Sequence, residues 1–81
     1  MGKTEIKFSG TLGTLEITFV DGMYAGHVYE IPGDTLVGGR FVIYPNTRIQ
    51  QTEPCEQSLT LEESNVIIRL LKPFTRYVEV R

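Results

Sequence analysis

The sequence has few of the residues on which disulfide-bonded and metal-binding proteins depend, and it has no long apolar run. Its 81 residues include one cysteine, one histidine and no tryptophan. A single cysteine cannot form an internal disulfide, which is typical of a reducing compartment, so we expect a cytoplasmic protein that is stabilised by packing. No apolar stretch approaches the roughly 20 residues of a membrane-spanning helix, and Met1 to Glu5 contain no apolar segment of the signal-peptide kind. We therefore expect neither a membrane partner nor export.

Length and composition indicate one small domain, residues 1–81. A chain of this size can form a single core, although it buries only about 60% or slightly more of the surface that its unfolded state exposes. Its hydrophobic fraction of 41% and charged fraction of 22% are ordinary for a globular protein and exclude a disordered tail or a coiled coil. The net charge of −2 lacks the basic excess of nucleic-acid-binding proteins, which disfavours nucleic acid as a partner without excluding it.

The clearest local pattern predicts a helix over about residues 60–72. Thr60 followed by Glu63 is a capping box, in which each side chain accepts a hydrogen bond from the backbone N–H of the other residue. Acidic residues follow the start of the segment and basic residues precede its end, as the helix dipole favours. Pro73 cannot continue the backbone ladder, so the helix should end near Leu71.

The apolar residues of this segment would cover more than half of the helix circumference, which indicates a wide apolar support such as a sheet face. They are Leu61, Val66, Ile67, Ile68, Leu70, Leu71 and Phe74. The remaining arc, which we expect to face solvent, consists of Glu62, Asn65, Arg69 and Lys72. The alternative is a buried strand over Val66 to Leu71, because β-branched residues open that run and short apolar runs are ambiguous in their periodicity.

Alternating apolar and polar residues predict two half-buried antiparallel strands near the N-terminus. The first covers residues 5–9 and the second covers residues 14–19, with Gly10 and Gly13 at their connection. Each strand therefore has one apolar face, and the two faces should contribute to the same core.

Turn signals then predict a third strand and two chain reversals. Asp21–Gly22 favours a type I′ hairpin turn, which needs positive φ at both central positions. The following strand, about Met23 to Ile31, has apolar residues of mixed parity, and we expect a bulge at Gly26. Pro32–Gly33 fits the centre of a type II turn.

The middle of the sequence predicts one central strand and one edge strand. Leu36 to Tyr44 is the most apolar candidate, so we expect it to be covered on both faces, with a bend at Gly38–Gly39. Pro45–Asn46 indicates a turn toward a polar strand, Arg48 to Thr52, that suits a sheet edge. Residues 53–58 lack periodicity and predict a loop. Because an unpaired edge can pair with the same strand of a second copy, we expect a homodimer.

The last residues alternate around Val78 and Val80 and predict a final strand that returns beside one of the first. The complete order is therefore βββββαβ. We predict an α+β fold in which one helix packs across one face of a small antiparallel sheet of five to six strands. An all-β roll or barrel is the alternative.

No arrangement of residues in the sequence is typical of an enzyme or of a cofactor site. His27 has no nucleophile or orienting group indicated beside it, so we expect a strand histidine that a neighbouring backbone group satisfies. Cys55 lies between Glu53 and Glu56, whose charges oppose thiolate formation. With one histidine and one cysteine, a zinc site would lack its usual ligands. We therefore predict a non-enzymatic protein without a cofactor or a metal.

Two sets of side chains are candidates for contact with a partner. Tyrosine is enriched in binding patches because its ring is apolar while its hydroxyl can stay wet. The four tyrosines are Tyr24, Tyr29, Tyr44 and Tyr77. We expect at least two of them, and all four phenylalanines, to pack in the core.

The second set is basic. Six of the eight lysines and arginines lie in residues 35–81, and two of them, Arg69 and Lys72, lie on the solvent-facing side of the predicted helix. The candidate residues are Asn65, Arg69, Lys72 and Arg76. Because the planar guanidinium of arginine pairs two ways with a carboxylate, these residues would suit an acidic surface. The alternative is an ordinary solvated helix face.

These observations favour a small protein-binding module that acts as an inhibitor or accessory factor by covering a surface of a larger protein. An origin in a phage or a mobile element would suit such a function. The alternative is a single-stranded nucleic-acid-binding protein that uses tyrosines and arginines on its sheet, which requires exposed aromatic side chains beside a positive groove.

Overall fold

The computed structural model describes residues 5–11, 13–36 and 38–81. The expected absence of a signal peptide concerns mainly residues 1–4, which lie outside the described part. In chain order the elements are β1 (Ile6–Thr11), β2 (Thr14–Phe19), β3 (Val28–Pro32), β4 (Asp34–Thr35), β5 (Phe41–Ile43), β6 (Gln50–Glu53), β7 (Gln57–Ser58), α1 (Leu61–Leu71) and β8 (Val78–Val80). Within these residues, no helix is long and apolar enough to cross a membrane.

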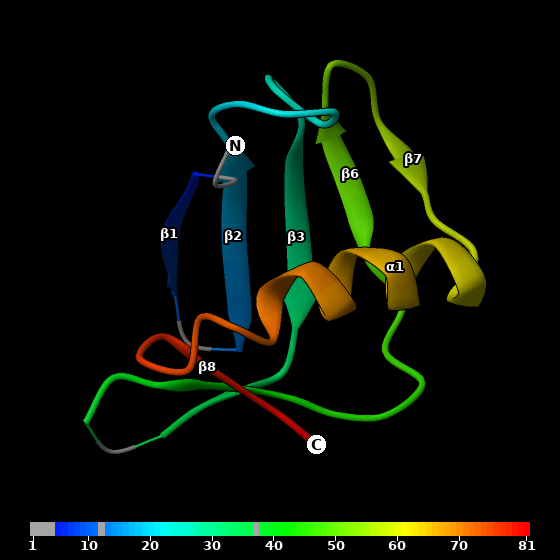
Figure 1. Ribbon diagram of the computed structural model, residues 1–81. Helices are drawn as coiled ribbons and strands as arrows, with labels where there is room; N and C mark the ends of the chain where they lie inside the picture. The colour runs from blue at the N-terminus through cyan, green and yellow to red at the C-terminus, as the bar shows by residue number, and fades with distance from the viewer. Residues whose placement is uncertain (1–4, 12, 37) are drawn as a thin grey trace.

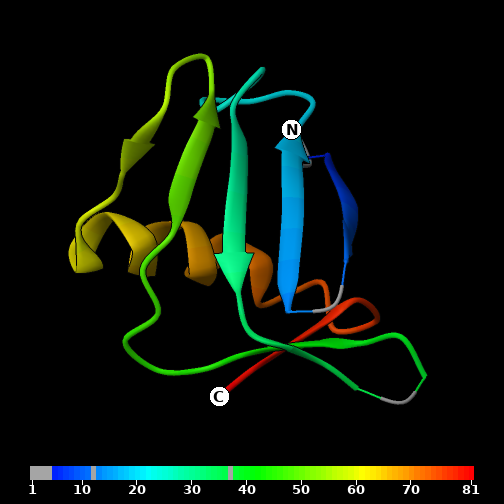
Figure 2. The ribbon, with the colours of Figure 1, turned by 180° about the vertical axis from the view of Figure 1, so that it is seen from behind.

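The elements form two sheets and one helix. Five antiparallel strands pair in the order β1-β2-β3-β6-β7, and α1 lies across one face of this sheet, as Figures 1 and 2 show from opposite sides. The other three strands form a small sheet in the order β4-β5-β8, in which β5 and β8 are parallel. The predicted α+β fold with a helix across an antiparallel sheet is therefore confirmed. The second sheet was not predicted.

The helix begins and ends where its local signals place it. Thr60 is the N-cap, and its Oγ1 accepts a hydrogen bond from the backbone N–H of Glu63 at 3.1 Å. In return, Oε1 of Glu63 accepts a hydrogen bond from the backbone N–H of Thr60 at 2.9 Å. The last helical residue is Leu71, two positions before Pro73. The capping box and the helix are confirmed, and the alternative of a buried strand over the same residues is wrong.

The buried stripe of the helix is narrower than its apolar arc. Its buried residues are Ser64, Ile67, Ile68 and Leu71. Leu61 and Val66, which belong to the predicted apolar arc, remain 37% and 41% exposed because they lie at its two margins. Leu70 and Phe74 are partly buried against the core. The predicted solvent stripe is confirmed, since all four of its residues are exposed.

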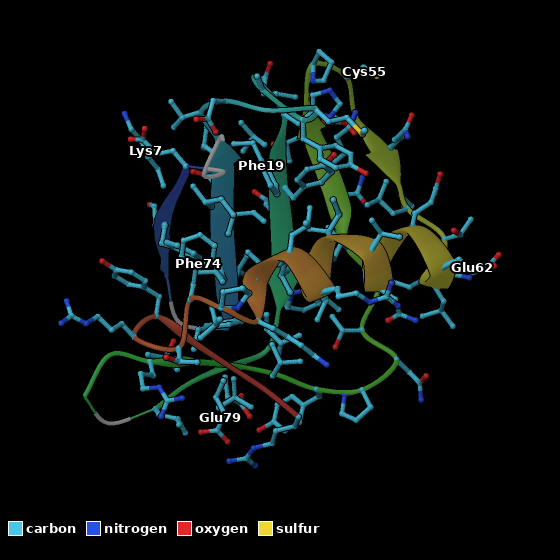
Figure 3. The ribbon with its side chains drawn as sticks, viewed as in Figure 1. Lys7, Phe19, Cys55, Glu62, Phe74 and Glu79 are labelled. Atoms are coloured by element: carbon cyan, nitrogen blue, oxygen red, sulfur yellow. The ribbon has the colours of Figure 1, made fainter. Side chains whose placement is uncertain are left out.

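The core lies between the helix, the inner face of the five-stranded sheet and the small sheet. Its buried side chains are Ile6, Leu15, Ile17, Phe19, Tyr29, Ile31, Phe41, Ile43, Ile49, Leu59, Ile67, Ile68, Leu71 and Val78. Phe8 packs at its margin with its ring centroid 5.4 Å from that of Phe74, which lies over β1 and β2 in Figure 3. All four phenylalanines thus belong to the core or pack against it, as predicted.

The connection between β2 and β3 is longer than the predicted tight turn at Asp21–Gly22. The backbone N–H of Gly26 donates to the carbonyl of Phe19 at 2.9 Å, and β3 begins only after this loop. Asp21 instead accepts a hydrogen bond from the backbone N–H of Glu5 at 2.7 Å, which ties the loop to the start of β1. The type I′ prediction is wrong because positive φ occurs at the glycine but not at the aspartate.

Two further turn predictions are also corrected. Gly26 lies in the loop, and the irregular register of β3 falls between Val28 and Tyr29, where β3 pairs with β6. Gly33 does not adopt the positive φ that a type II turn requires, and the chain passes directly from β3 into β4. A Cβ atom at Gly33 would collide with the carbonyl oxygen of Val42, so glycine serves close packing there.

The predicted strand over Leu36 to Tyr44 is reduced to Phe41–Ile43. These three residues are buried and lie in the middle strand of the small sheet, so the predicted cover on both faces is confirmed. Gly38 and Gly39, at φ of 100° and 92°, form a hairpin turn before this strand and do not bend its interior. Val37 lies outside the described residues.

The predicted edge strand is not an edge. β6 (Gln50–Glu53) pairs with β3 on one side and with β7 on the other, and β7 lies in residues 53–58, which were predicted to be a loop. The proposed pairing of residues 48–52 with a second copy therefore has no free edge to use. The last strand, β8, lies beside β5 and parallel to it, whereas the sequence pattern placed it beside one of the first strands.

Candidate functional site

A cleft of about 290 Å³ lies beside the helix and collects four of the eight predicted partner-binding residues. We call it the basic cleft. Its lining residues are Tyr44, Pro45, Asn46, Asn65, Ile68, Arg69, Lys72, Val80 and Arg81. Three of them are cationic and none is an aspartate or a glutamate. The cleft is therefore a locally positive site on a chain whose net charge is −2.

The helix supplies one wall of the basic cleft. Asn65, Arg69 and Lys72 follow one another at intervals of four and three residues, which places them on the same side of a helix. All three are exposed, whereas Ile68 between them is buried and forms the floor. Because the helix is anchored by its capping box and its buried stripe, the two cations project from a rigid element.

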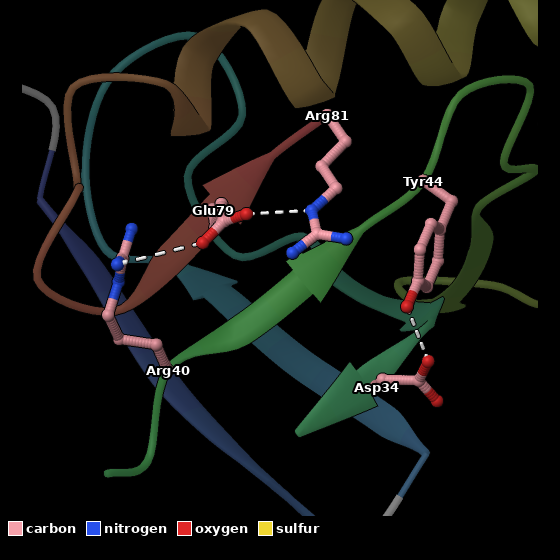
Figure 4. Close-up of polar contacts among 5 residues, drawn as sticks. All are labelled: Asp34, Arg40, Tyr44, Glu79 and Arg81. Atoms are coloured by element: carbon pink, nitrogen blue, oxygen red, sulfur yellow. Dashed lines mark hydrogen bonds and ion pairs between the residues drawn. The ribbon is translucent and has the colours of Figure 1, made fainter. Parts of the chain in front are cut away.

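The segment after β5 supplies the opposite wall. Pro45–Asn46 forms the predicted turn, and Asn46 adopts a left-handed conformation with φ of 62° that asparagine tolerates better than most residues. The hydroxyl of Thr47 donates to the carbonyl of Tyr44 at 2.6 Å and closes this turn. The hydroxyl of Tyr44 donates to a carboxylate oxygen of Asp34 in β4, as Figure 4 shows. The bond to Asp34 thus holds the ring of Tyr44, which lines the cleft.

Arg81 lines the basic cleft and is a candidate site residue that sequence reasoning missed. Its Nε donates to Oε2 of Glu79 at 2.7 Å, and its guanidinium carbon lies 5.9 Å from the centroid of the Tyr44 ring. Glu79 also faces Arg40 across 3.7 Å, so one carboxylate lies between two arginines in Figure 4. Only the parallel pairing of β8 with β5 brings Arg81 to Tyr44, and no local pattern in the sequence predicts that pairing.

The charges around the cleft shift the pKa values of its groups. The hydrogen bond from Arg81 lowers the pKa of Glu79, and the same bond raises the pKa of the Arg81 guanidinium. The hydrogen bond to Asp34 raises the pKa of the Tyr44 hydroxyl, and partial loss of hydration adds to the shift. All three groups therefore keep their usual charge near neutral pH.

Two of the three cations in the cleft have no carboxylate partner. Over residues 5–11, 13–36 and 38–81, the ion pairs within 4 Å are those of Glu79 with Arg40 and with Arg81. Arg69 and Lys72 are therefore available to an anionic group from outside the chain. Asn65 adds to the same wall an amide side chain, which can donate a hydrogen bond to a carboxylate.

The other predicted partner-binding residues lie elsewhere. Arg76 is exposed in the turn before β8 and is not among the residues that line the basic cleft. Tyr77 is 50% exposed, and its ring stacks on Phe8 with centroids 4.8 Å apart. Tyr29 is buried and Tyr24 packs against the core, so two tyrosines are core residues, as predicted. The eight predicted residues thus do not form one surface.

His27 and Cys55 each form a contact with a nearby side chain. Nδ1 of His27 lies 2.9 Å from the hydroxyl of Tyr29, so the partner of this histidine is a side chain and not the predicted backbone group. Cys55 is exposed at the connection between β6 and β7 (Figure 3). Its carbonyl accepts a hydrogen bond from the side-chain amide of Gln51 at 3.0 Å. Within the part of the chain that the structure describes, no three His, Cys, Asp or Glu side chains are placed to hold a metal ion.

The face of the large sheet that points away from the helix is polar. One row of paired residues crosses all five strands: Ser9, Glu16, Glu30, Gln50 and Ser58. Glu16 and Glu30 are direct neighbours in this row, which makes its centre negative. None of the four tyrosines belongs to the row. The arrangement of stacking aromatics and cations that a nucleic-acid-binding sheet uses is therefore not found along it.

Comparisons with protein-family models, with curated proteins and with solved structures found no match to this chain. The function must therefore be inferred from the chain's own residues. The feature that collects four of the eight predicted contact residues is the basic cleft, which joins Asn65, Arg69 and Lys72 to Tyr44 and adds Arg81.

Proposed function

We propose that this chain is a small non-enzymatic protein-binding module that covers an acidic surface of a larger protein, as an inhibitor or an accessory factor. The observation that carries the proposal is the basic cleft, where Arg69 and Lys72 from the helix meet Arg81 from the end of β8 without a carboxylate in the lining. We further propose a cytoplasmic setting, because Cys55 is exposed and unpaired.

Charge complementarity selects the kind of partner. Arg69 and Lys72, which have no carboxylate partner among the described residues, would meet carboxylates of an acidic segment, while Tyr44 in the lining offers an apolar ring. Tyrosine and arginine are the residues that most often anchor protein interfaces. A phosphate backbone would also meet the cations, but the row across the sheet face that points away from the helix contains the Glu16–Glu30 pair and no tyrosine on which a base could stack.

The test compares charge reversal inside the cleft with the same reversal outside it. The variant Arg69→Glu with Lys72→Glu changes the net charge by four, and Lys7→Glu with Arg48→Glu changes it equally at exposed positions outside the lining. Both variants should melt within about 3 °C of the wild type, since exposed charges contribute little to stability.

The readout is capture of a partner from a lysate of cells that express the protein, followed by titration of the captured protein at rising salt. The proposal expects an acidic protein that binds the wild type and the outside variant but not the cleft variant, with affinity that falls as salt rises. Equal capture by the cleft variant would contradict it. Binding of oligo-deoxythymidine with a steep salt dependence would instead favour the nucleic-acid alternative.

The non-enzymatic character has its own test. Replacing His27 by phenylalanine and Cys55 by serine removes the only imidazole and the only thiol, while an aromatic ring and a small polar side chain remain. We expect partner binding and its biological effect to persist in this double variant. Loss of the effect in a folded double variant that still binds the partner would indicate catalysis.

A further inference from the structure

A second hollow, of about 200 Å³, lies on the other side of the helix from the basic cleft. We call it the aromatic hollow. The helix contributes Glu63, Val66 and Ile67 to it, whereas the basic cleft uses positions on the opposite side of the helix. The sheet side contributes Tyr24, His27 and Tyr29. Among the residues that the structure describes, no lysine or arginine lines this hollow, and the one formal charge in its lining is the carboxylate of Glu63.

Three aromatic rings form one continuous wall of the hollow. The ring centroids of Tyr24 and His27 lie 5.9 Å apart at an interplanar angle of 74°, and those of His27 and Tyr29 lie 5.9 Å apart at 46°. Phe19 supports the wall from the core, at 5.5 Å from Tyr24 and 5.8 Å from Tyr29. The contact between His27 Nδ1 and the Tyr29 hydroxyl fixes two of the rings relative to each other. The wall is therefore preorganised.

Glu63 brings negative charge to the same place. One carboxylate oxygen accepts from the backbone N–H of Thr60, which fixes the side chain at the start of the helix. The pKa of Tyr29 is raised first by burial, then by Tyr24 and then by Glu63, so these groups act on one another electrostatically. A carboxylate and aromatic rings in one lining, without a lysine or an arginine among its described residues, favour a negative potential in the hollow, which is the reverse of the basic cleft.

We propose that the aromatic hollow binds an organic ammonium group. Such a group is attracted both by aromatic faces and by a carboxylate, and its alkyl substituents suit the apolar part of the lining, Leu59, Val66 and Ile67. The ammonium can belong to a lysine side chain of a protein or to a free quaternary ammonium compound. This inference is independent of the partner proposed for the basic cleft, because the two sites share no lining residue.

The test uses choline and its neutral isostere, 3,3-dimethylbutan-1-ol, which has nearly the same shape without the charge. Titrations of the intact chain are followed by the NMR signals of the Tyr24 and Tyr29 rings. We expect choline to bind with a dissociation constant on the order of 1–10 mM, and the isostere to bind at least about fivefold more weakly. Equal affinity for both compounds, or no saturable response to choline, would overturn the proposal.

Matched variants locate the site. Glu63→Gln removes the charge but keeps an amide oxygen for the capping box, and Glu62→Gln removes the neighbouring charge, which does not line the hollow. Choline affinity should fall about fivefold in Glu63→Gln and in Tyr24→Leu, but not in Glu62→Gln. An equal loss in both glutamate variants would show a non-specific charge effect and would overturn the assignment.

A further titration distinguishes the two sources of the group. Short acetylated peptides that carry lysine or trimethyllysine are compared with choline on the wild-type chain. Tighter binding of either peptide than of choline supports a lysine side chain of a protein as the occupant, since peptide contacts beyond the ammonium then add to affinity. Tighter binding of choline supports a free compound.

Discussion

The side-chain hydroxyl of Ser64, on the buried side of α1, accepts a hydrogen bond from the backbone N–H of Ile49 at 2.9 Å. Ser64 is 0% exposed and Ile49 is 1% exposed. Ile49 lies in the short segment between the turn at the basic cleft and β6, so this bond joins the helix to the chain that forms the opposite wall. A buried backbone donor without a partner is costly, and the serine satisfies it.

Ser64→Ala should therefore destabilise the protein more than its small volume suggests. The backbone donor of Ile49 would remain buried without an acceptor, at a cost of about 1–3 kcal/mol in the free energy of unfolding. Urea denaturation measures the change. Ser58→Ala is the matched control, because the hydroxyl of Ser58 donates to Gln50 at 2.8 Å in an exposed position, where we expect a loss of about 0.5 kcal/mol or less. Equal losses in the two variants would contradict this account of Ser64.

The capping box gives a second prediction about stability. Thr60→Ala removes the acceptor for the backbone N–H of Glu63 and should lower the free energy of unfolding by about 1 kcal/mol. Thr60→Ser keeps that acceptor and should preserve most of the stability. Circular dichroism should show a modest helical signal over a dominant β signal, and that signal should melt at a lower temperature in Thr60→Ala than in Thr60→Ser. Identical melting of the two variants would argue against the cap.

The helix could be predicted from the sequence because its signals are local. The capping residues, the charges at the ends and Pro73 all lie within fourteen consecutive positions, residues 60–73, and they agree with one another. The same holds for β1 and β2, which pair as an antiparallel hairpin, and the predicted alternation appears in β2 as alternating half-buried and buried residues. Asn65, Arg69 and Lys72 were placed on one exposed side for the same reason, since a helix fixes the relation between neighbours four positions apart.

The remaining features depend on contacts between distant residues. β7 is a strand only because Gln57 and Ser58 pair with β6, and nothing in their own side chains favours that state. β8 became the parallel neighbour of β5, and this pairing alone brings Arg81 to the basic cleft. The predicted tight turn at Asp21–Gly22 does not form, because Asp21 accepts a hydrogen bond from the backbone N–H of Glu5, sixteen residues earlier. Local turn statistics contain no information about such an acceptor.

Self-association remains a prediction, but the structure places a free strand edge at β1 and not at β6. In the described residues β1 pairs on one side only, with β2, whereas β6 is paired on both sides. The backbone N–H of Val20 donates to the carbonyl of Glu5, so these two residues form a hydrogen-bonded pair. Because hydrogen-bonded and non-hydrogen-bonded pairs alternate along an antiparallel ladder, the backbone N–H and C=O groups of Ile6 and Phe8 point away from β2. We expect a homodimer in which two β1 strands pair at these groups.

Light scattering across micromolar to millimolar concentrations tests this expectation. The amide protons of Ile6 and Phe8 should exchange with solvent more slowly as the concentration rises, whereas those of Gln50 and Gln51 in β6 should not respond. A monomer at the highest concentration would remove the idea of a homodimer. If the amide protons of β6 were instead protected more strongly as the concentration rises, the dimer contact would lie at residues 48–52, as the sequence predicted.

The last prediction concerns alkaline pH. Burial raises the pKa of the Tyr29 hydroxyl above its ordinary value of 10.0, and Tyr24 and Glu63 add to the shift. The folded state therefore holds this proton more tightly than the unfolded state. The resulting stability is fully present below pH 10.0 and is lost as the pH rises through the raised pKa of the folded protein.

Tyr29→Phe should reduce this loss. The variant loses the contact with Nδ1 of His27, so at neutral pH its free energy of unfolding should fall by about 1 kcal/mol. Between pH 10 and 12, however, its stability should fall less steeply than that of the wild type, because no phenol remains to ionise at this buried position. Tyr44, whose pKa is raised by its bond to Asp34, contributes in the same direction and remains in both proteins. Urea denaturation at several alkaline pH values gives the slopes, and equal slopes would show that Tyr29 ionises as readily in the folded protein as in the unfolded chain.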